Sequence, residues 1–301
     1  MKKRIIITGG NGQDGIILTK LLIKKKYSIY SFINKQKFSK IKSVKYYNIN
    51  LTNQKIVEQT LNNIKPIAIV HLASKNSSTI KNKSMKYDLF YKKNLLITKN
   101  LINSIPKIKK KIKFIFAGSS LMFSKTTGKV NESSKFKANC YYSKYKIDAH
   151  NYLMFMKKKF KLFATTAILF NHDSKYRNSK FLFPRLVNYL KNKKFNLIRD
   201  IYKQNIIGDF SHAEDVCDGF YSLILSKKNP DKIIFSSNQL SKVNDIINFS
   251  FKKLKIKKSL PKPKKSKIRL IGNNSLGKKL LKWKPKKNSL MAFNELLENM
   301  L

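Results

Sequence analysis

The chain begins with a short apolar run, residues 5–7, that leads directly into a glycine-rich turn. Gly9, Gly12 and Gly15 stand three positions apart, and an apolar segment with helical spacing follows them. Such a turn between a buried strand and a helix brings backbone N–H groups close to a pyrophosphate, at the positive end of the helix dipole. Glycine permits the positive φ and the close packing that this geometry needs. The pattern predicts a dinucleotide-binding fold; the alternative is a purely structural strand–turn–helix.

The turn opens an alternation of apolar and amphipathic segments through the first two-thirds of the chain. The expected strands are residues 4–8, 28–33, 44–48, 67–72, 114–118 and 162–170, and the expected helices are residues 12–24, 54–64, 95–105 and 142–158. Apolar strands that alternate with helices are typical of a parallel sheet covered on both faces. We therefore predict the α/β class, as a Rossmann-like doubly wound parallel sheet with a smaller C-terminal substrate-binding lobe.

The sheet domain and the C-terminal lobe are expected to take unequal shares of the chain. Residues 1–170 are expected to form the NAD(P)-binding Rossmann domain, to which segments near 205–238 return. Residues 171–301 are expected to form mainly the smaller substrate-binding lobe, since the chain becomes rich in Pro and Lys from Pro261 and ends in a helical pattern. In folds of this class the ligand lies at the carboxyl ends of the strands.

Composition is that expected of a cytoplasmic α/β protein. The chain has 301 residues, of which 42% are hydrophobic, which is enough for a substantial core. Its two cysteines, Cys140 and Cys217, indicate no disulfide framework and fit a reducing compartment. The apolar run at residues 5–7 is too short for a signal peptide or a membrane span, so we expect no membrane association.

The formal net charge is +50, from 65 basic and 15 acidic residues. Five of the basic residues are arginines and 60 are lysines, spread along the whole chain. Arginine makes most bidentate contacts with bases and phosphates, whereas lysine is a solvated point charge. We interpret the excess as a general lysine bias and expect no specific nucleic-acid partner, although nonspecific binding at low salt is expected.

Tyr142 and Lys146 are four residues apart in an expected helix, which places both side chains on one face. A lysine ammonium beside a phenol favours the phenolate, so the pKa of Tyr142 is expected to fall below about 10. Such a tyrosine exchanges a proton with an alcohol while a hydride moves to a nicotinamide. The pair alone is more typical of a solvated helix face than of a catalytic site. Ser119 and Ser120, at the end of an expected strand, complete an ordered set of Ser, Tyr and Lys.

These residues resemble the extended short-chain dehydrogenase/reductases and, among them, the GDP-mannose 4,6-dehydratase family (NAD-dependent epimerase/dehydratases). Motifs occur in the family's order over nearly the whole chain, at residues 8–15, 50–53, 71–74, 119–120, 142–146, 168–174, 209–215 and 281–285. The Gln-Asp-Gly at residues 13–15 and the Leu-Phe-Asn-His-Asp-Ser at residues 169–174 indicate the dehydratase branch.

The resemblance implies a role for each matching position. The catalytic residues would be Ser119, Tyr142 and Lys146. The residues that would hold NADP, or alternatively NAD, are Gly9, Gly10, Asn11, Gly12, Gln13, Asp14, Gly15, Asn34, Lys35, Lys37, Asn50, Leu51, Leu72, Ala73, Ser74, Lys146, His172 and Arg177. The residues that would contact the substrate are Ser120, Asn171 and Arg185. Lysines stand after the second strand, where an acid would bind the ribose of NAD, and this favours NADP.

The resemblance also implies a nucleotide-sugar substrate, GDP-linked, and a homodimer or homotetramer. We expect no metal site, because His150 and His212 lack partners at metal-ligand spacing. His71 is expected to pack beside the sheet.

The chain departs from the family pattern at two positions. The family has a glutamate after the serine pair, where it acts as the base that removes the C5 proton, but this chain has Leu121. No Asp or Glu occurs from Leu89 through Asn131, and Glu132 would have to fold back to replace it. The family usually has an arginine before Asp209, where it holds substrate phosphates, but this chain has Gly208.

Three functions therefore stay open. The first is a sugar-nucleotide 4,6-dehydratase, which oxidises C4, eliminates water and reduces C6. The second is a sugar-nucleotide 4-ketoreductase or 4-epimerase, which needs Ser119, Tyr142 and Lys146 but no glutamate. The third is a noncatalytic protein on the same fold that binds NADP or nucleic acid.

Overall fold

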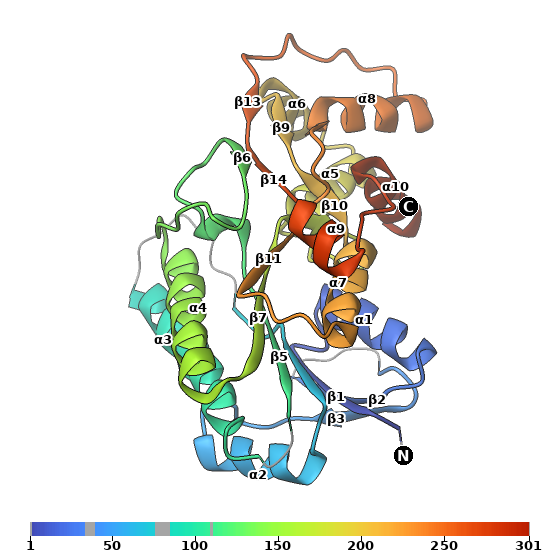
Figure 1. Cartoon of the computed structure of the whole chain (residues 1–301). Helices are drawn as coiled ribbons and strands as arrows, with labels where there is room; N and C mark the ends of the chain where they lie inside the picture. Colours follow the sequence, from blue (N-terminus) through green and yellow to red (C-terminus); the bar gives the residue numbers. More distant parts are fainter. Residues whose placement is uncertain (1, 34–39, 76–84, 109–110, 301) are drawn as a thin grey trace.

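The computed structural model describes residues 2–33, 40–75, 85–108 and 111–300 of the chain. Its centre is a seven-stranded parallel sheet with the strand order β11-β7-β5-β4-β1-β2-β3 (Figure 1). The strands are β1 (Arg4–Thr8), β2 (Ser28–Phe32), β3 (Val44–Tyr47), β4 (Ala68–His71), β5 (Lys113–Ala117), β7 (Phe163–Leu169) and β11 (Lys232–Phe235). This arrangement confirms the predicted doubly wound α/β fold.

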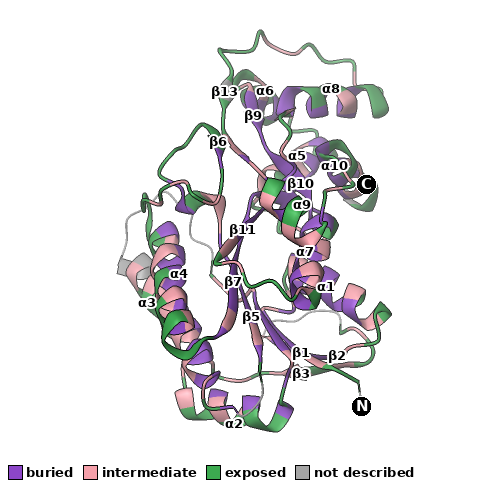
Figure 2. Ribbon diagram, in the orientation of Figure 1, coloured by how far each residue is buried: buried purple, intermediate pink, exposed green. Residues whose placement is uncertain are grey.

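Helices cover both faces of the sheet (Figure 1). On one face lie α1 (Gln13–Lys24) and α7 (Ala213–Leu225), and their apolar side chains share a core with β1, β4 and β11. On the other face lie α2 (Gln54–Ile64), α3 (Met85–Ser104) and α4 (Tyr141–Phe160). The strands between them are buried almost throughout, except for the edge strand β3, of which no residue is buried (Figure 2). Burial on both faces explains why the sequence shows continuous apolar runs at the strands.

The register of the sheet brings several strand ends to one edge. Thr8 pairs with Phe32 and with His71, and His71 pairs with Phe116. Strands β1, β4 and β5 therefore end side by side. The glycine turn, the loop after β4 and the serine pair after β5 consequently lie at the same carboxyl edge, although they are far apart in the sequence.

The C-terminal lobe lies beyond this edge. Its helices are α5 (Leu182–Lys191), α6 (Phe195–Lys203), α8 (Val243–Lys253), α9 (Ser275–Leu281) and α10 (Ser289–Met300). Its short strands are β8 (Asn171–Asp173), β9 (Ile206–Gly208), β10 (Phe210–His212), β12 (Ser241–Lys242), β13 (Lys267–Ile268) and β14 (Leu270–Gly272), and β14 pairs with β6 (Gly128–Val130). Phe183, Phe210 and Phe293 are fully or almost fully buried at the centre of the lobe.

The expected strands all occur, with each end shifted by at most one residue. The helix expected at residues 95–105 instead begins at Met85. Its first described turns carry exposed side chains such as Leu89, and the pair Asp88–Lys92 at 2.7 Å supports them locally. Apolar periodicity reveals only the buried part of a helix, so the sequence pattern missed this segment.

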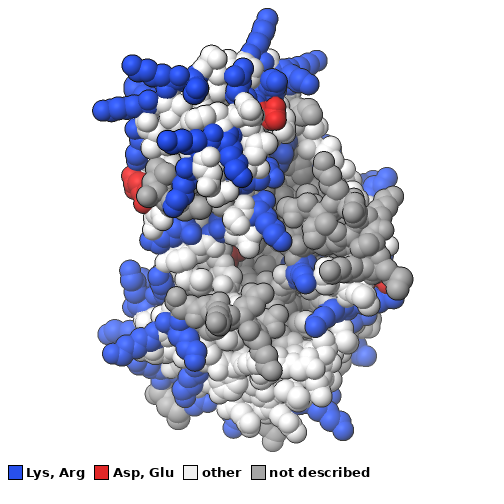
Figure 3. Space-filling view, turned by 180° about the vertical axis from the view of Figure 1, so that it is seen from behind, with Lys and Arg blue, Asp and Glu red and all other residues white. Residues whose placement is uncertain are grey.

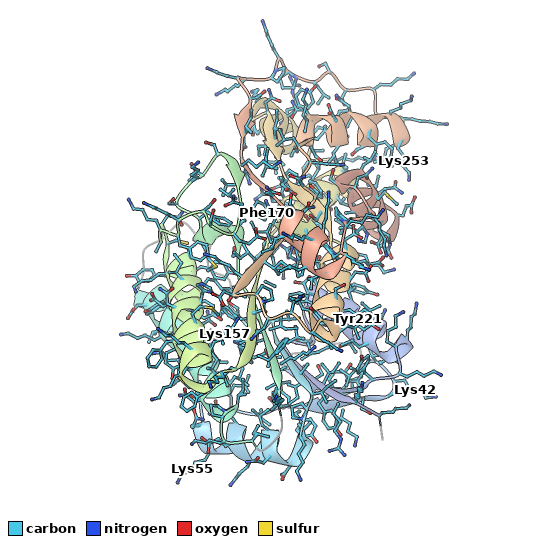
Figure 4. The ribbon with its side chains drawn as sticks, viewed as in Figure 1. Lys42, Lys55, Lys157, Phe170, Tyr221 and Lys253 are labelled. Atoms are coloured by element: carbon cyan, nitrogen blue, oxygen red, sulfur yellow. The ribbon has the colours of Figure 1, made fainter. Side chains whose placement is uncertain are left out.

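Lysine and arginine side chains are scattered over much of the face that Figure 3 shows, above all at its top and along its left edge. Lys42, Lys55 and Lys253 illustrate the distribution, since they extend outward from three separate parts of the chain (Figure 4). No helix in the described part of the chain has the length and apolar character to span a membrane.

Candidate active site

The glycine turn after β1 is built around positions that only glycine fits. Gly9 has φ +72°, and a Cβ there would lie 2.9 Å from the backbone N of Ala73. A Cβ on Gly15 would lie 2.5 Å from the carbonyl oxygen of Gly9. No side chain caps the start of α1, in contrast to α2, whose first turn is capped by Asn53. Uncapped amides at a helix start form an anion site, so the turn fits a pyrophosphate.

A cavity of about 640 Å³ lies between the carboxyl edge of the sheet and the lobe. Phe170, labelled at the centre of Figure 4, lies in its wall. The expected site residues that line the cavity are Asp14, Leu72, Ser74, Ser119, Ser120, Tyr142, Lys146, Asn171, His172, Arg177 and Arg185. The fold thus gathers residues from positions 14 to 185 around one space.

Other expected site residues lie apart from this cavity. Gly10, Asn11 and Gly12 form the turn itself, beside Gly9. Asn50 and Leu51 lie in the loop after β3, where Leu51 O accepts a hydrogen bond from Asn100 Nδ2 at 3.0 Å. Asn34, Lys35 and Lys37 lie outside the described residues.

Ser119 is separated from the end of β5 only by Gly118 and caps a short 3₁₀ turn, η1 (Ser120–Met122). Its Oγ accepts a hydrogen bond from the backbone N–H of Leu121 at 3.2 Å. Because the oxygen acts as an acceptor here, the hydroxyl proton of Ser119 is available to a ligand oxygen in the cavity.

Tyr142 and Lys146 lie one turn apart on α4 and both face the cavity. Lys146 is 2% exposed, and its Nζ donates a hydrogen bond to Ala117 O at 2.7 Å. The ammonium also lies 5.5 Å from the ring centroid of Tyr142 and 4.9 Å from that of Tyr145. Burial lowers the pKa of Lys146 to about 7.

The expected acidification of Tyr142 by Lys146 is wrong in this structure. Desolvation by the surrounding protein raises the pKa of Tyr142 above its ordinary value, and the neighbouring phenol of Tyr145 raises it further. Lys146 does not offset this effect, because its ammonium is directed at Ala117 O and is only partly charged at neutral pH. Tyr142 is therefore a neutral phenol, able to donate its proton.

His71 packs beside the sheet, as expected. Its Nδ1 lies 2.7 Å from Thr8 Oγ1 and its Nε2 lies 2.9 Å from Thr98 Oγ1. Burial, together with the charge of Lys146, lowers the pKa of His71 to about 3. The ring is therefore neutral and links β1, β4 and α3.

His172, which is buried, and Asp14, which is half-buried, form an ion pair at the edge of the cavity. His172 Nε2 lies 3.0 Å from each carboxylate oxygen of Asp14, and His172 Nδ1 lies 2.7 Å from Phe170 O. Both ring nitrogens face acceptors, so the ring must carry two protons. Burial opposes charge on either group, but their mutual attraction outweighs it; the pKa of His172 is raised and the pKa of Asp14 is lowered.

A second pair lies next to the first. Arg177 Nε lies 3.3 Å from Asp173 Oδ1, and the guanidinium lies 3.6 Å from the ring centroid of Phe181. Burial raises the pKa of Asp173, although Arg177 opposes the shift. Asp14 and Asp173 are the acidic residues of the described cavity wall, and each has a cationic partner.

Glu132 does not fold back into the cavity to replace the missing glutamate. Its Oε1 accepts a hydrogen bond from the backbone N–H of Ile234 in β11 at 2.9 Å. Leu121 lines the cavity instead, beside Ser119, with 37% of its surface exposed. The cavity therefore has an apolar side chain where the resemblance implies a carboxylate.

Arg269 is a cavity residue that sequence reasoning missed. It follows β13, and its backbone N–H donates to Ile207 O at 2.8 Å. A Cβ on Gly208 would lie 3.6 Å from Arg269 Cβ, so Arg269 lies beside the position where an arginine was expected. The residue type could have pointed to Arg269, because arginine is rare in this chain and only five of its residues are arginines.

Residues of the 209–215 motif connect parts of the lobe that are far apart in the sequence. The Asp209 carboxylate accepts hydrogen bonds from Ser237 N at 2.8 Å and from Gly272 N at 3.1 Å. Trp283 Nε1 donates to Asp215 O at 2.8 Å. Within the described ranges, no group of three or more His, Cys, Asp or Glu side chains could hold a metal ion.

Comparison with known sequences identifies a whole-chain match. A family model described as GDP-mannose 4,6 dehydratase matches residues 6–300. The chain is 26% identical over 328 aligned residues to GDP-mannose 4,6 dehydratase 1 of Arabidopsis thaliana, covering 100% of this chain and 89% of the relative. It is 23% identical to GDP-mannose 4,6 dehydratase of Dictyostelium discoideum, covering 100% of this chain and 95% of the relative.

Solved structures share the fold at lower identity. UDP-glucose 4-epimerase of Thermotoga maritima, with UDP-glucose, superposes with a TM-score of 0.83 at 18% identity, covering 98% of this chain and 97% of that one. The dTDP-glucose 4,6-dehydratase of Bacillus anthracis, in complex with NAD, superposes with a TM-score of 0.81 at 16% identity, covering 98% and 96%.

Proposed function

The chain belongs to the GDP-mannose 4,6 dehydratase family, and from this premise we propose that it is an NADP-dependent 4,6-dehydratase of a GDP-linked sugar. The coarser part, a sugar-nucleotide enzyme of the dehydratase and epimerase class, follows from the family. The finer part is the NADP-dependent 4,6-dehydration of a GDP-linked sugar. The observation that best supports it is that Ser119, Tyr142 and Lys146 line the same cavity as Asp14, which lies in the first turn of α1 just after the glycine turn.

The glycine turn and the start of α1 would hold the pyrophosphate of the cofactor. Their fit is supported by the left-handed Gly9 and by the lack of space for a Cβ at Gly9 and Gly15. Leu72 and Ser74, at the end of β4, would line the nicotinamide side. When bound, the cofactor accepts a hydride from the sugar and returns it.

Three residues of this chain would handle the proton and the developing charge at C4. Ser119 would donate its free hydroxyl proton to the C4 oxygen. Tyr142, a neutral phenol at rest, would donate its proton to the C4 oxygen when the ketone is reduced. To take up the C4 hydroxyl proton when a ketone forms, it would first have to lose its own proton to water. Protonated Lys146, one turn away, would favour the phenolate that Tyr142 must pass through. A lysine with a pKa near 7 changes charge easily within the working pH range.

The cationic wall of the cavity would bind the diphosphate of the substrate. Arg185 on α5 and Arg269 after β13 both line it, as do Lys125 and Lys180. Arginine matches phosphate oxygens with two parallel hydrogen bonds. The family usually has a phosphate-binding arginine where this chain has Gly208. We propose that Arg269 binds the substrate phosphates in its place.

A second candidate function is 4-ketoreduction or 4-epimerisation of a sugar nucleotide. Leu121 favours it, because elimination of water needs a base for the C5 proton whereas C4 redox chemistry does not. The hydrogen bond from Ile234 N to the Glu132 carboxylate favours it too, because it holds Glu132 away from the position of the missing base.

Mass spectrometry of the sugar nucleotide after incubation with GDP-mannose and catalytic NADP⁺ tests the proposal. A product lighter by one water supports the dehydratase. An unchanged mass, with GDP-mannose binding established by a thermal shift, contradicts it. In that case turnover of a 4-keto sugar nucleotide with NADPH would establish the second candidate.

We also propose a homodimer formed through α3 and α4. These helices lie side by side on the outer face of the sheet (Figure 1) and expose Leu89, Leu96 and Phe155 at 60%, 44% and 59%. Large exposed apolar side chains on two neighbouring helices are typical of a protein interface.

A further inference from the structure

Two side chains at the start of α1 contact the first strand of the lobe. Gln13 Nε2 donates to His172 O at 3.2 Å, and Gln13 Oε1 accepts from Ser174 Oγ at 3.0 Å. Both carboxylate oxygens of Asp14 lie 3.0 Å from His172 Nε2. These contacts, which we call the Gln13–Asp14 clamp, join residues that are 158 to 161 positions apart.

The clamp is buried and charged. Gln13, His172 and Ser174 are 8%, 5% and 1% exposed. His172 carries two protons because Phe170 O accepts from its Nδ1 while Asp14 accepts from its Nε2. Breaking an ion pair of this kind by removing one partner is destabilising, so the clamp couples the position of residues 172–174 to that of α1.

The clamped segment is also part of the cavity wall. Asn171 and His172 line the cavity, and Asp173 in the same strand pairs with Arg177 at 3.3 Å. The backbone N–H of Arg177 donates to Ser174 O at 2.9 Å. The position of Arg177 in the cavity therefore depends on a residue that Gln13 holds.

We propose that Gln13 and Asp14 are positioning residues through which cofactor binding at the glycine turn strengthens sugar-nucleotide binding in the cavity. The inference rests on the proposed function for the identity of both ligands. A cofactor that immobilises the turn also immobilises the residues directly after it, Gln13 and Asp14. The clamp then orders residues 171–177, so the second ligand loses less conformational freedom when it binds. Thermodynamic linkage requires that the sugar nucleotide strengthens cofactor binding by the same factor.

Isothermal titration calorimetry with GDP as the probe tests this coupling. GDP is titrated into the full chain alone and into the chain saturated with NADP⁺. We expect the affinity for GDP to rise by about five-fold or more with NADP⁺, which is the usual range of coupling between sites. In the double variant Gln13→Ala, Asp14→Asn the rise should fall to nearly one-fold, while GDP affinity without NADP⁺ changes less.

The chain offers a matched control at α2. Gln54 Nε2 donates to Ser104 Oγ at 3.0 Å, and Glu58 pairs with Lys107 at 2.5 Å, so a glutamine and an acid here join α2 to other parts of the chain. The double variant Gln54→Ala, Glu58→Gln should keep the full effect of NADP⁺. Equal coupling in the wild type and the clamp variant would overturn the proposal, as would GDP binding to the wild type that NADP⁺ does not change. Absence of GDP binding to the wild type would instead overturn the proposed function, and this inference with it.

Two further measurements guard against a folding defect. Ser174→Ala removes the Gln13 contact from the lobe side and should lower the coupling in the same direction, with a melting temperature close to that of the wild type. The chain has four histidines, so the ring signals of His172 can be assigned by NMR with a His172→Asn variant. Asp14→Asn should lower the pKa of His172, because it removes the carboxylate that raises this pKa and leaves the opposing charge of Arg177 in place. An unchanged pKa of His172 would overturn the role of Asp14.

Discussion

The hydroxyl oxygen of Ser119 accepts a hydrogen bond from the backbone N–H of Leu121 at 3.2 Å, so both residues belong to one tight turn at the cavity wall. The serine that would donate to the C4 oxygen and the leucine in the position of the family's base would therefore face the same part of a bound sugar. In the proposed function, a change at residue 121 would act beside the reacting carbons.

Leu121→Glu should create or raise dehydration of GDP-mannose if only the base is missing. A positioned general base contributes about 10²- to 10⁴-fold to a rate, so the water-loss product should become easy to detect by mass spectrometry. Leu121→Gln has the same shape without the proton-accepting charge and serves as the control. No gain with glutamate would show that other cavity residues have diverged too, and equal gains in both variants would contradict proton transfer.

Tyr142→Phe should abolish hydride transfer and leave cofactor binding in place. The change removes only the hydroxyl, and loss of a proton-transfer group lowers turnover by about 10²- to 10⁴-fold. Because the cofactor returns its hydride and NADPH does not accumulate, mass spectrometry of the sugar nucleotide measures the loss of turnover, and calorimetry measures NADP⁺ affinity. Tyr141, the preceding residue, is 43% exposed, so Tyr141→Phe is a matched control that should keep activity. Turnover retained in Tyr142→Phe would contradict its role.

The sequence predicted the sheet well because each central strand is a continuous buried apolar run. It also predicted the main cavity residues, because Ser119, Tyr142 and His172 belong to local motifs at strand ends or on one helix face. Arg269 was missed for a physical reason. Its backbone lies beside β9, where Arg269 N bonds to Ile207 O, and no local pattern reveals a contact between segments 62 residues apart.

The charge states of the site residues also could not be predicted from the sequence. Spacing placed Lys146 next to Tyr142 correctly, but the direction of the Tyr142 pKa depends on burial and on the bond from Lys146 to Ala117 O. Likewise, only the fold shows that Asp14 contacts His172, which fixes the doubly protonated ring.

The buried ammonium of Lys146 should make stability depend on pH. Burial lowers its pKa to about 7, whereas an unfolded chain has a lysine near 10.5. The unfolded state therefore binds more protons between these values, so the free energy of unfolding should rise with pH from about 7 towards 10. Denaturant titrations at several pH values, for the wild type and Lys146→Met, isolate this contribution as their difference. A difference that does not change with pH would show that Lys146 keeps an ordinary pKa.

Arg269→Ala should weaken binding of GDP. A hydrogen bond to a charged group contributes about 1.5–3 kcal/mol, so affinity should fall by roughly 10- to 100-fold. Arg199 lies on α6 outside the cavity wall, and Arg199→Ala controls for the loss of one positive charge from this basic chain. Calorimetry at two salt concentrations separates the effects, because general attraction is screened by salt whereas direct contact persists. Equal losses in both variants would contradict a specific phosphate contact for Arg269.

Phe155→Lys should convert a dimer into a monomer if α3 and α4 form the interface. Phe155 is 59% exposed on α4, and a lysine at its position would place a charge in an apolar contact without disturbing the core. Light scattering coupled to size exclusion measures the mass of the particle. Leu225 at the end of α7 is 55% exposed, so Leu225→Lys introduces the same charge at a comparable apolar site on the other side of the sheet. The control should stay dimeric. A wild-type chain that elutes as a monomer, or a Phe155→Lys variant that stays dimeric, would exclude this face as the interface.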